Sequence, residues 1–159
     1  MLVIERQVKA EVYPRNAVAM LNQVAEYISK QGERPSGKAF VRILTLEEAS
    51  NRFESKIRFQ AGYPVSTELA GENDISRRDL PGGAVVSALL GDPVDSFVRA
   101  FNAWPVIFKF AEKEGYTLDS GWGGNGGWQE FIEIPPVSGK GHESRLYLPV
   151  FLSSHGAER

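Results

Sequence analysis

The sequence predicts an α+β fold in which two similar halves share one antiparallel sheet, with the helices on one side of that sheet. Apolar residues alternate in several short segments and recur at helical spacing in two longer ones. The order strand, helix, strand, strand occurs twice, in residues 1–66 and 80–152, at an offset of roughly 80–90 residues. A Gly-Tyr-Pro-Val motif at 62–65 also has a near copy, Tyr-Leu-Pro-Val, at 147–150. Two halves built in this way are expected to form a pseudo-two-fold sheet with a ligand cleft between them.

The first half contains one predicted helix and three predicted strands. Residues 5–13 alternate weakly and predict a strand that Pro14 ends. Asn16 is expected to cap a helix over residues 16–31, with an apolar stripe on one face and Gly32 as its left-handed C′ residue. The remaining segments are predicted strands at 39–44 and 55–65 and a polar turn at 47–52.

The second half follows a polar segment, residues 67–79, which we expect to be an exposed connector. Asp92 and Pro93 predict the start of a helix over residues 92–114, which Gly115 closes. Pro105 lies inside this helix and is expected to kink it near Phe101 or to split it in two. The predicted strands of this half are 84–90, 128–134 and 145–152, followed by a frayed tail at 153–159.

Composition excludes several classes of function. The 159 residues suffice for one domain, and a net charge of −2 with no basic recognition helix predicts no direct nucleic-acid binding. No apolar run approaches the roughly 20 residues that cross a bilayer, and no signal peptide is evident, so we expect no membrane association and a cytoplasmic location. The absence of cysteine excludes thiolate catalysis, and His142 and His155 lack metal-ligand spacing, so neither a metal nor another cofactor is predicted.

Five segments carry a resemblance that spans nearly the whole chain. They are Gly-Tyr-Pro-Val at 62–65, Leu-Pro-Gly-Gly-Ala at 80–84, Phe-Ala-Glu-Lys-Glu-Gly at 110–115, Trp-Gln-Glu-Phe at 128–131 before Pro135, and Leu-Tyr-Leu-Pro-Val at 146–150. In this order and spacing they resemble the GyrI-like small-molecule-binding domain, the effector-binding domain of many AraC- and MerR-type multidrug regulators. The resemblance implies a stand-alone domain of this kind over residues 1–159.

The resemblance also implies a polar residue in the pocket. The family usually carries a glutamate there, in a Glu-x-Tyr pattern on the penultimate strand. An ungapped match puts Gln129 and Phe131 on those two positions, whereas a shift of one residue puts Glu130 on the acid and Ile132 on the tyrosine. Side chains alternate along a strand, so Gln129 and Glu130 cannot both face inward unless the strand contains a bulge. The sequence leaves both alternatives open.

The predicted pocket is aromatic and takes a small amphipathic or cationic aromatic molecule. Each aromatic face attracts a desolvated cation by roughly 0.5–2 kcal/mol, and a carboxylate would add charge complementarity. The Gly-rich loop at 121–127 is a candidate lid that carries Trp122. The alternative is that the aromatic residues are plain core and Glu130 is solvated. The candidate ligand-binding residues are Glu130, Gln129, Trp104, Phe108, Trp128, Phe131, Tyr147, Phe40, Tyr63 and Trp122.

Three functions are compatible with these residues. The first is a binding module that senses or sequesters its ligand. The second is a hydrolase of electrophilic small molecules, in which Glu130, helped by Tyr147 or Tyr63, supplies acid/base chemistry; we assign no catalytic residue. The third is an inhibitor that docks onto a separate protein partner. A homodimer is compatible with any of the three.

Overall fold

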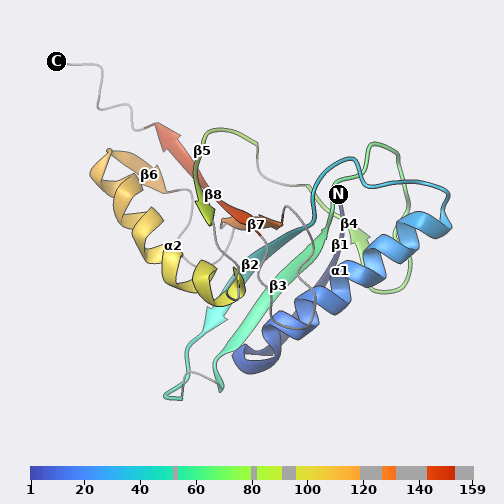
Figure 1. Ribbon diagram of the computed structural model, residues 1–159, viewed down its shortest axis with the longest axis horizontal. Coiled ribbons are helices and arrows are strands. Elements are labelled where there is room, and N and C mark those ends of the chain that lie inside the picture. Colours follow the sequence, from blue (N-terminus) through green and yellow to red (C-terminus); the bar gives the residue numbers. More distant parts are fainter. Residues whose placement is uncertain (52–53, 80–81, 91–95, 119–126, 132–142, 153–159) are drawn as a thin grey trace.

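The computed structural model describes residues 1–51, 54–79, 82–90, 96–118, 127–131 and 143–152. These residues form an α+β fold with one antiparallel sheet and two α-helices, as the sequence predicted (Figure 1). The elements are β1 (Leu2–Lys9), a 3-10 turn (Ala10–Val12), α1 (Tyr13–Lys30), β2 (Phe40–Glu47), β3 (Lys56–Tyr63), β4 (Ile75–Arg77), β5 (Val85–Leu90), α2 (Ser96–Lys113), β6 (Tyr116–Leu118), β7 (Trp128–Phe131) and β8 (Ser144–Leu152).

The strand order shows that the two halves have the same topology. The sheet runs β4-β1-β3-β2-β7-β8-β5, and β6 pairs with the end of β8. In the first half, β1, α1, β2 and β3 give the spatial order β1-β3-β2; in the second, β5, α2, β7 and β8 give β5-β8-β7. The third strand of each half is therefore its middle strand. The antiparallel pairing of β2 with β7 joins the halves edge to edge.

Both helices cover the same face of the sheet, as expected. Helix α1 packs on β1 and β3, and α2 packs on β5, β6 and β8 (Figure 1). Strand pairing confirms the common face, because one row of paired residues runs from beneath α1 to beneath α2. That row consists of Ile4, Ala61, Val41, Gln129, Leu146 and Ala88.

The opposite face carries the residues that alternate with that row. The side chains of Trp128 and Glu130 belong to this face, because they flank Gln129 in β7. One row on this face consists of Glu5, Gln60, Arg42, Trp128, Tyr147 and Ser87. The next row consists of Val3, Gly62, Phe40, Glu130, Arg145 and Leu89.

The start of α1 differs from the prediction. The first strand is Leu2–Lys9 rather than 5–13, and the helix already begins at Tyr13. Pro14 lies in the first helical turn, where its missing N–H costs nothing, so it starts the helix instead of ending the strand. Asn16 is inside the helix and is not its cap; its Nδ2 donates to the carbonyl oxygen of Val12 at 2.9 Å. Gly32 follows the helix with φ +74°, as expected for C′.

Other boundaries differ because pairing overrides local sequence. Strand β2 continues past its predicted end at residue 44 to Glu47, the first residue of the expected turn, with a register irregularity between Ile43 and Thr45. The expected connector at 67–79 contains β4, which pairs with β1, and β6 was not predicted. Helix α2 continues through Pro105 without being split, since the apolar stripe on either side of the proline stays packed on the sheet.

Some predicted features lie outside the described residues. They are the Asp92–Pro93 helix start, Trp122 with most of the Gly-rich loop at 121–127, residues 132–134 of the predicted strand, the tail at 153–159, and both histidines.

Gly62 provides a direct test of the strand packing. A Cβ at this position would lie 2.0 Å from the Leu2 carbonyl oxygen, so β1 or β3 would have to shift. We expect Gly62→Ala to lower the free energy of unfolding by about 1–3 kcal/mol. Gly82→Ala is the matched control, because no atom lies within 4 Å of its added Cβ. Urea unfolding of both variants measures the difference, and equal stabilities would contradict this packing.

The Glu5 carboxylate makes stability depend on pH. Burial raises the Glu5 pKa. Hydrogen bonds from Gln60 Nε2 (2.9 Å) and Arg58 Nε (2.7 Å), together with the Arg58 charge, lower it by more than burial raises it, so the net pKa lies below the ordinary value of 4.5. A carboxyl whose pKa is lower in the folded state stabilises the fold above its unfolded pKa and ceases to do so as pH falls through the folded pKa.

We therefore expect Glu5→Gln to lose stability less steeply than the native chain as pH falls below about 4.5. Glu112→Gln, which removes the same charge from an exposed position of α2, is the control. Denaturant unfolding across this pH range checks the prediction. A native-like slope for Glu5→Gln would show that this network does not contribute.

Candidate functional site

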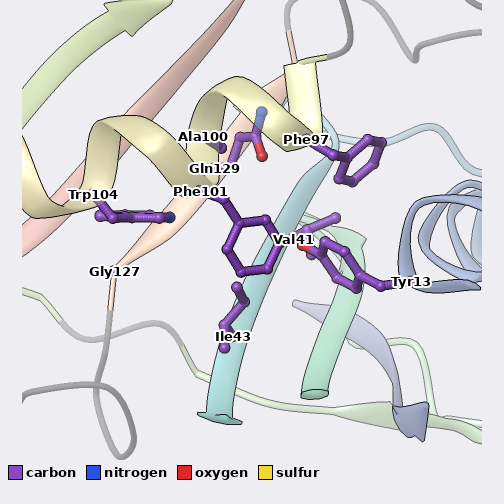
Figure 2. A pocket seen from close by; sticks show the side chains of 9 residues that line it. All are labelled: Tyr13, Val41, Ile43, Phe97, Ala100, Phe101, Trp104, Gly127 and Gln129. Carbon is purple, nitrogen blue, oxygen red and sulfur yellow. The ribbon is translucent and has the colours of Figure 1, made fainter. Parts of the chain in front are cut away.

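A cleft lies between the two helices, above the seam where the halves join. Val41 of β2 and Gln129 of β7 pair across this seam and form part of the floor of the cleft. Tyr13 enters from the start of α1, and Phe101 and Trp104 enter from α2 (Figure 2). The cleft has two parts, a narrow inner compartment and a wider outer groove, which share the rings of Tyr13, Phe97 and Phe101.

The inner compartment is almost filled by its own side chains. Its free volume is about 10 Å³, which is enough for about one water molecule. Gly127 is needed here because a Cβ would lie 2.3 Å from Cη2 of Trp104, so the backbone just before β7 packs closely against the indole. The inner compartment is lined by Tyr13, Val41, Ile43, Phe97, Ala100, Phe101, Trp104, Gly127 and Gln129.

Tyr13 contacts both halves across the cleft. Its ring meets Phe59 of the first half edge-on, with centroids 4.8 Å apart. It also meets Phe97 and Phe101 of the second half edge-on, at 5.4 and 5.8 Å. Such edge-to-face contacts favour a fixed geometry. Burial raises the pKa of Tyr13, so its hydroxyl is protonated at neutral pH and this wall of the cleft is uncharged.

Gln129 is the polar residue that β7 directs into the cleft. It is only 3% exposed, and its Nε2 donates to Ser144 Oγ of β8 at 2.8 Å. A buried amide that is hydrogen-bonded avoids the large desolvation cost of a buried carboxylate. Of the two alternatives that the sequence left open, the structure has Gln129 toward the cleft and Glu130 on the opposite face.

The outer groove is larger and carries negative charge. Its volume is about 770 Å³, within the range of small-molecule sites. Two exposed carboxylates, Glu11 and Glu48, line it, and no lysine or arginine does so among the described lining residues. The groove is lined by Ala10, Glu11, Tyr13, Pro14, Leu46, Glu48, Ala49, Ser50, Ser55, Ile57, Phe97, Phe101 and Asn102.

Four of the sequence-predicted residues gather on the opposite face of the sheet. The rings of Trp128 and Tyr147 stack 5.1 Å apart at 12°, and Trp128 packs in one cluster with Phe40. Burial raises the Tyr147 pKa, and the charge of Glu130 and a hydrogen bond with its carboxylate raise it further. This group is separated from the cleft by the sheet itself.

The other predicted residues lie on the helix face or nearby. Trp104 lines the inner compartment, and Phe131 packs beneath Phe97 with ring centroids 5.2 Å apart. Phe108 belongs to the core beneath α2, and its ring centroid lies 6.0 Å from that of Trp104. Tyr63 lies in the core with α1; burial raises its pKa to about 12, and its buried hydroxyl has no hydrogen-bond partner among the described residues. Trp122 lies outside the described residues.

Sequence reasoning missed several residues that build the cleft. Phe97 and Phe101 lie in α2, but helical spacing alone does not show which of its apolar residues meet the other half. Tyr13 was assigned to the end of a strand. Had Pro14 been interpreted as an N-terminal helix residue, Tyr13 would have been placed at the first turn, beside the seam.

No described helix is long and apolar enough to cross a membrane. Within the described ranges, no three side chains of the metal-binding kinds lie together.

Comparison with known proteins shows a similarity of fold. No protein-family model matches the chain, and the comparison with curated proteins gives no match. Among solved structures, this chain is similar to a protein chain in the cryo-EM structure of the EcmrR-DNA complex in EcmrR-RPo, with a TM-score of 0.59 and 14% sequence identity. The match covers 94% of this chain and 53% of the other, so this chain spans about half the length of its structural neighbour.

The hydrogen bond between Gln129 and Ser144 can be tested by a double-mutant cycle. Ser144→Ala leaves the buried amide without this acceptor, and we expect it to lower the free energy of unfolding by about 1–3 kcal/mol. Gln129→Leu in the Ser144→Ala background should cost less than Gln129→Leu alone, because the bond is already lost. Additive costs in chemical denaturation would show that the two side chains are not coupled.

Proposed function

We propose that the chain is a single GyrI-like effector-binding domain that binds a small amphipathic cation in the cleft between its helices. The outer groove carries this proposal, because it joins aromatic rings and carboxylates in a space of suitable size. The fold it shares with a chain of the EcmrR-DNA complex supports the relation to regulator domains. The five sequence segments that resemble the GyrI-like family support the narrower assignment.

The charges of the groove suggest how such a ligand would lie. The rings of Tyr13, Phe97 and Phe101 form an uncharged wall against which a flat ring system would stack. The carboxylates of Glu11 and Glu48 belong to the same groove and would face a positively charged group. Because these carboxylates are exposed, they stay solvated in the empty groove, and a cationic ligand need not compensate a buried charge.

The hydrolase alternative receives no added support from the cleft. Its acid, Glu130, lies on the opposite face of the sheet with Tyr147, whereas Tyr63 lies in the core with α1. A reaction that used Glu130 with Tyr147 would take place on that face and not between the helices.

Binding can be tested with rhodamine 6G as the probe and fluorescence anisotropy as the readout. Phe101→Ala removes a ring from the groove wall, and we expect it to raise the Kd about tenfold, the equivalent of about 1.4 kcal/mol. Phe108→Ala is the matched control, since it removes the same ring from the same helix but from the core beneath α2. The combined change Glu11→Gln and Glu48→Gln should weaken binding of rhodamine 6G but not of the uncharged dye Nile red.

Two outcomes would contradict the proposal. The first is the absence of saturable rhodamine 6G binding to the folded native chain. The second is an equal loss of affinity in Phe101→Ala and Phe108→Ala at temperatures where both variants remain folded by circular dichroism.

A further inference from the structure

The two edges of the sheet differ in how they are protected from pairing with another strand. At one edge, β4 has only three residues, and Arg77 in it forms an ion pair with Glu68 at 3.7 Å. Short length and charge are the usual protections of an edge. At the other edge, β5 has six residues, Val-Val-Ser-Ala-Leu-Leu, with no charge and no proline. No described strand pairs with its outer side.

The register of β5 shows which backbone groups face outward. Val150 N–H donates to the Ala84 carbonyl at 3.0 Å, so Ala84 and Val150 form a hydrogen-bonded pair. Such pairs alternate along an antiparallel ladder, so the next residue, Val85, does not bond to β8. Val85 and its partner Pro149 thus form a non-hydrogen-bonded pair. Val85, Ser87 and Leu89 therefore direct their N–H and C=O groups away from β8.

The outward-facing residues of β5 match a second copy of themselves. In an antiparallel pair centred on Ser87, each Val85 lies opposite Leu89 of the partner subunit, and all the outward N–H and C=O groups face one another. Val85 and Leu89 are 40% and 54% exposed, and they lie on the face opposite the helices. Pairing would cover two apolar cross-strand pairs, which are favourable in sheets.

We propose that the chain forms a two-fold symmetric homodimer through antiparallel pairing of β5 with β5 of a second copy. The argument rests on hydrogen-bond and side-chain complementarity at one edge, and it is independent of the proposed ligand cleft. Pairing joins the two sheets into one continuous sheet across the dimer axis. It also covers an edge that no other described strand pairs with.

The oligomeric state tests this proposal. It is measured by sedimentation velocity at protein concentrations from low to several hundred micromolar. The native chain should sediment as a dimer in the upper part of this range. Ser87→Pro removes an outward N–H without touching the bonds to β8, and Leu89→Lys places a charge on the edge; each should raise the dimer Kd at least about tenfold. Val106→Lys, which alters a 66% exposed residue of α2, should leave the Kd unchanged.

A cysteine reporter identifies the interface, because the chain contains no cysteine of its own. The two copies of Ser87→Cys would meet across the axis about 5.5 Å apart at Cα, within reach of a disulfide. Oxidation should therefore cross-link Ser87→Cys rapidly and Val106→Cys hardly at all. A native chain that is monomeric throughout, a dimer that survives both edge variants, or equal cross-linking at both positions would overturn the proposal.

Discussion

The short pairing between β2 and β7 is the constraint on which the rest of the structure depends. It joins Phe40 to Glu130, Val41 to Gln129 and Arg42 to Trp128, and a bond from Phe131 N–H to the Ala39 carbonyl, 2.9 Å long, extends it. This register decides which side chains face the helices. A slip of one residue in β7 would exchange its faces and carry the Glu130 carboxylate into the cleft, with Gln129 outside. The uncharged floor of the cleft is thus a consequence of strand register.

The helices turn that seam into a cleft because each brings aromatic residues to its edge. Tyr13 reaches the seam only because α1 begins there, directly after the 3-10 turn. Phe97 and Phe101 reach it because they lie in the first two turns of α2. The result is a separation of chemistry in space. Neutral, buried groups fill the inner compartment, and the carboxylates of Glu11 and Glu48 stand in the open groove, where charge is less costly.

The sequence predicted the architecture better than it predicted the site. Hydrophobic periodicity is local, and it sufficed for the two helices, the main strands and the duplicated order. Strand β4 and the extension of β2 to Glu47 were not predicted, because pairing with a distant strand, and not a local sequence pattern, holds them extended. The site needed two facts that one sequence does not contain, the register of β7 and the residues of each half that face the other. Aromatic content therefore drew attention equally to Trp104, which lines the cleft, and to Trp128 and Tyr147, which lie behind the sheet.

The most direct test of the account is a methyl NMR titration of the native chain with rhodamine 6G. The account predicts shift changes at Ile43, Leu46 and Ile57, whose side chains line the two parts of the cleft. Val3 and Leu89, on the opposite face, should not respond to the probe. Changes centred on Val3 and Leu89, with the cleft methyl groups unmoved, would contradict the account by placing the ligand on the face that carries Glu130.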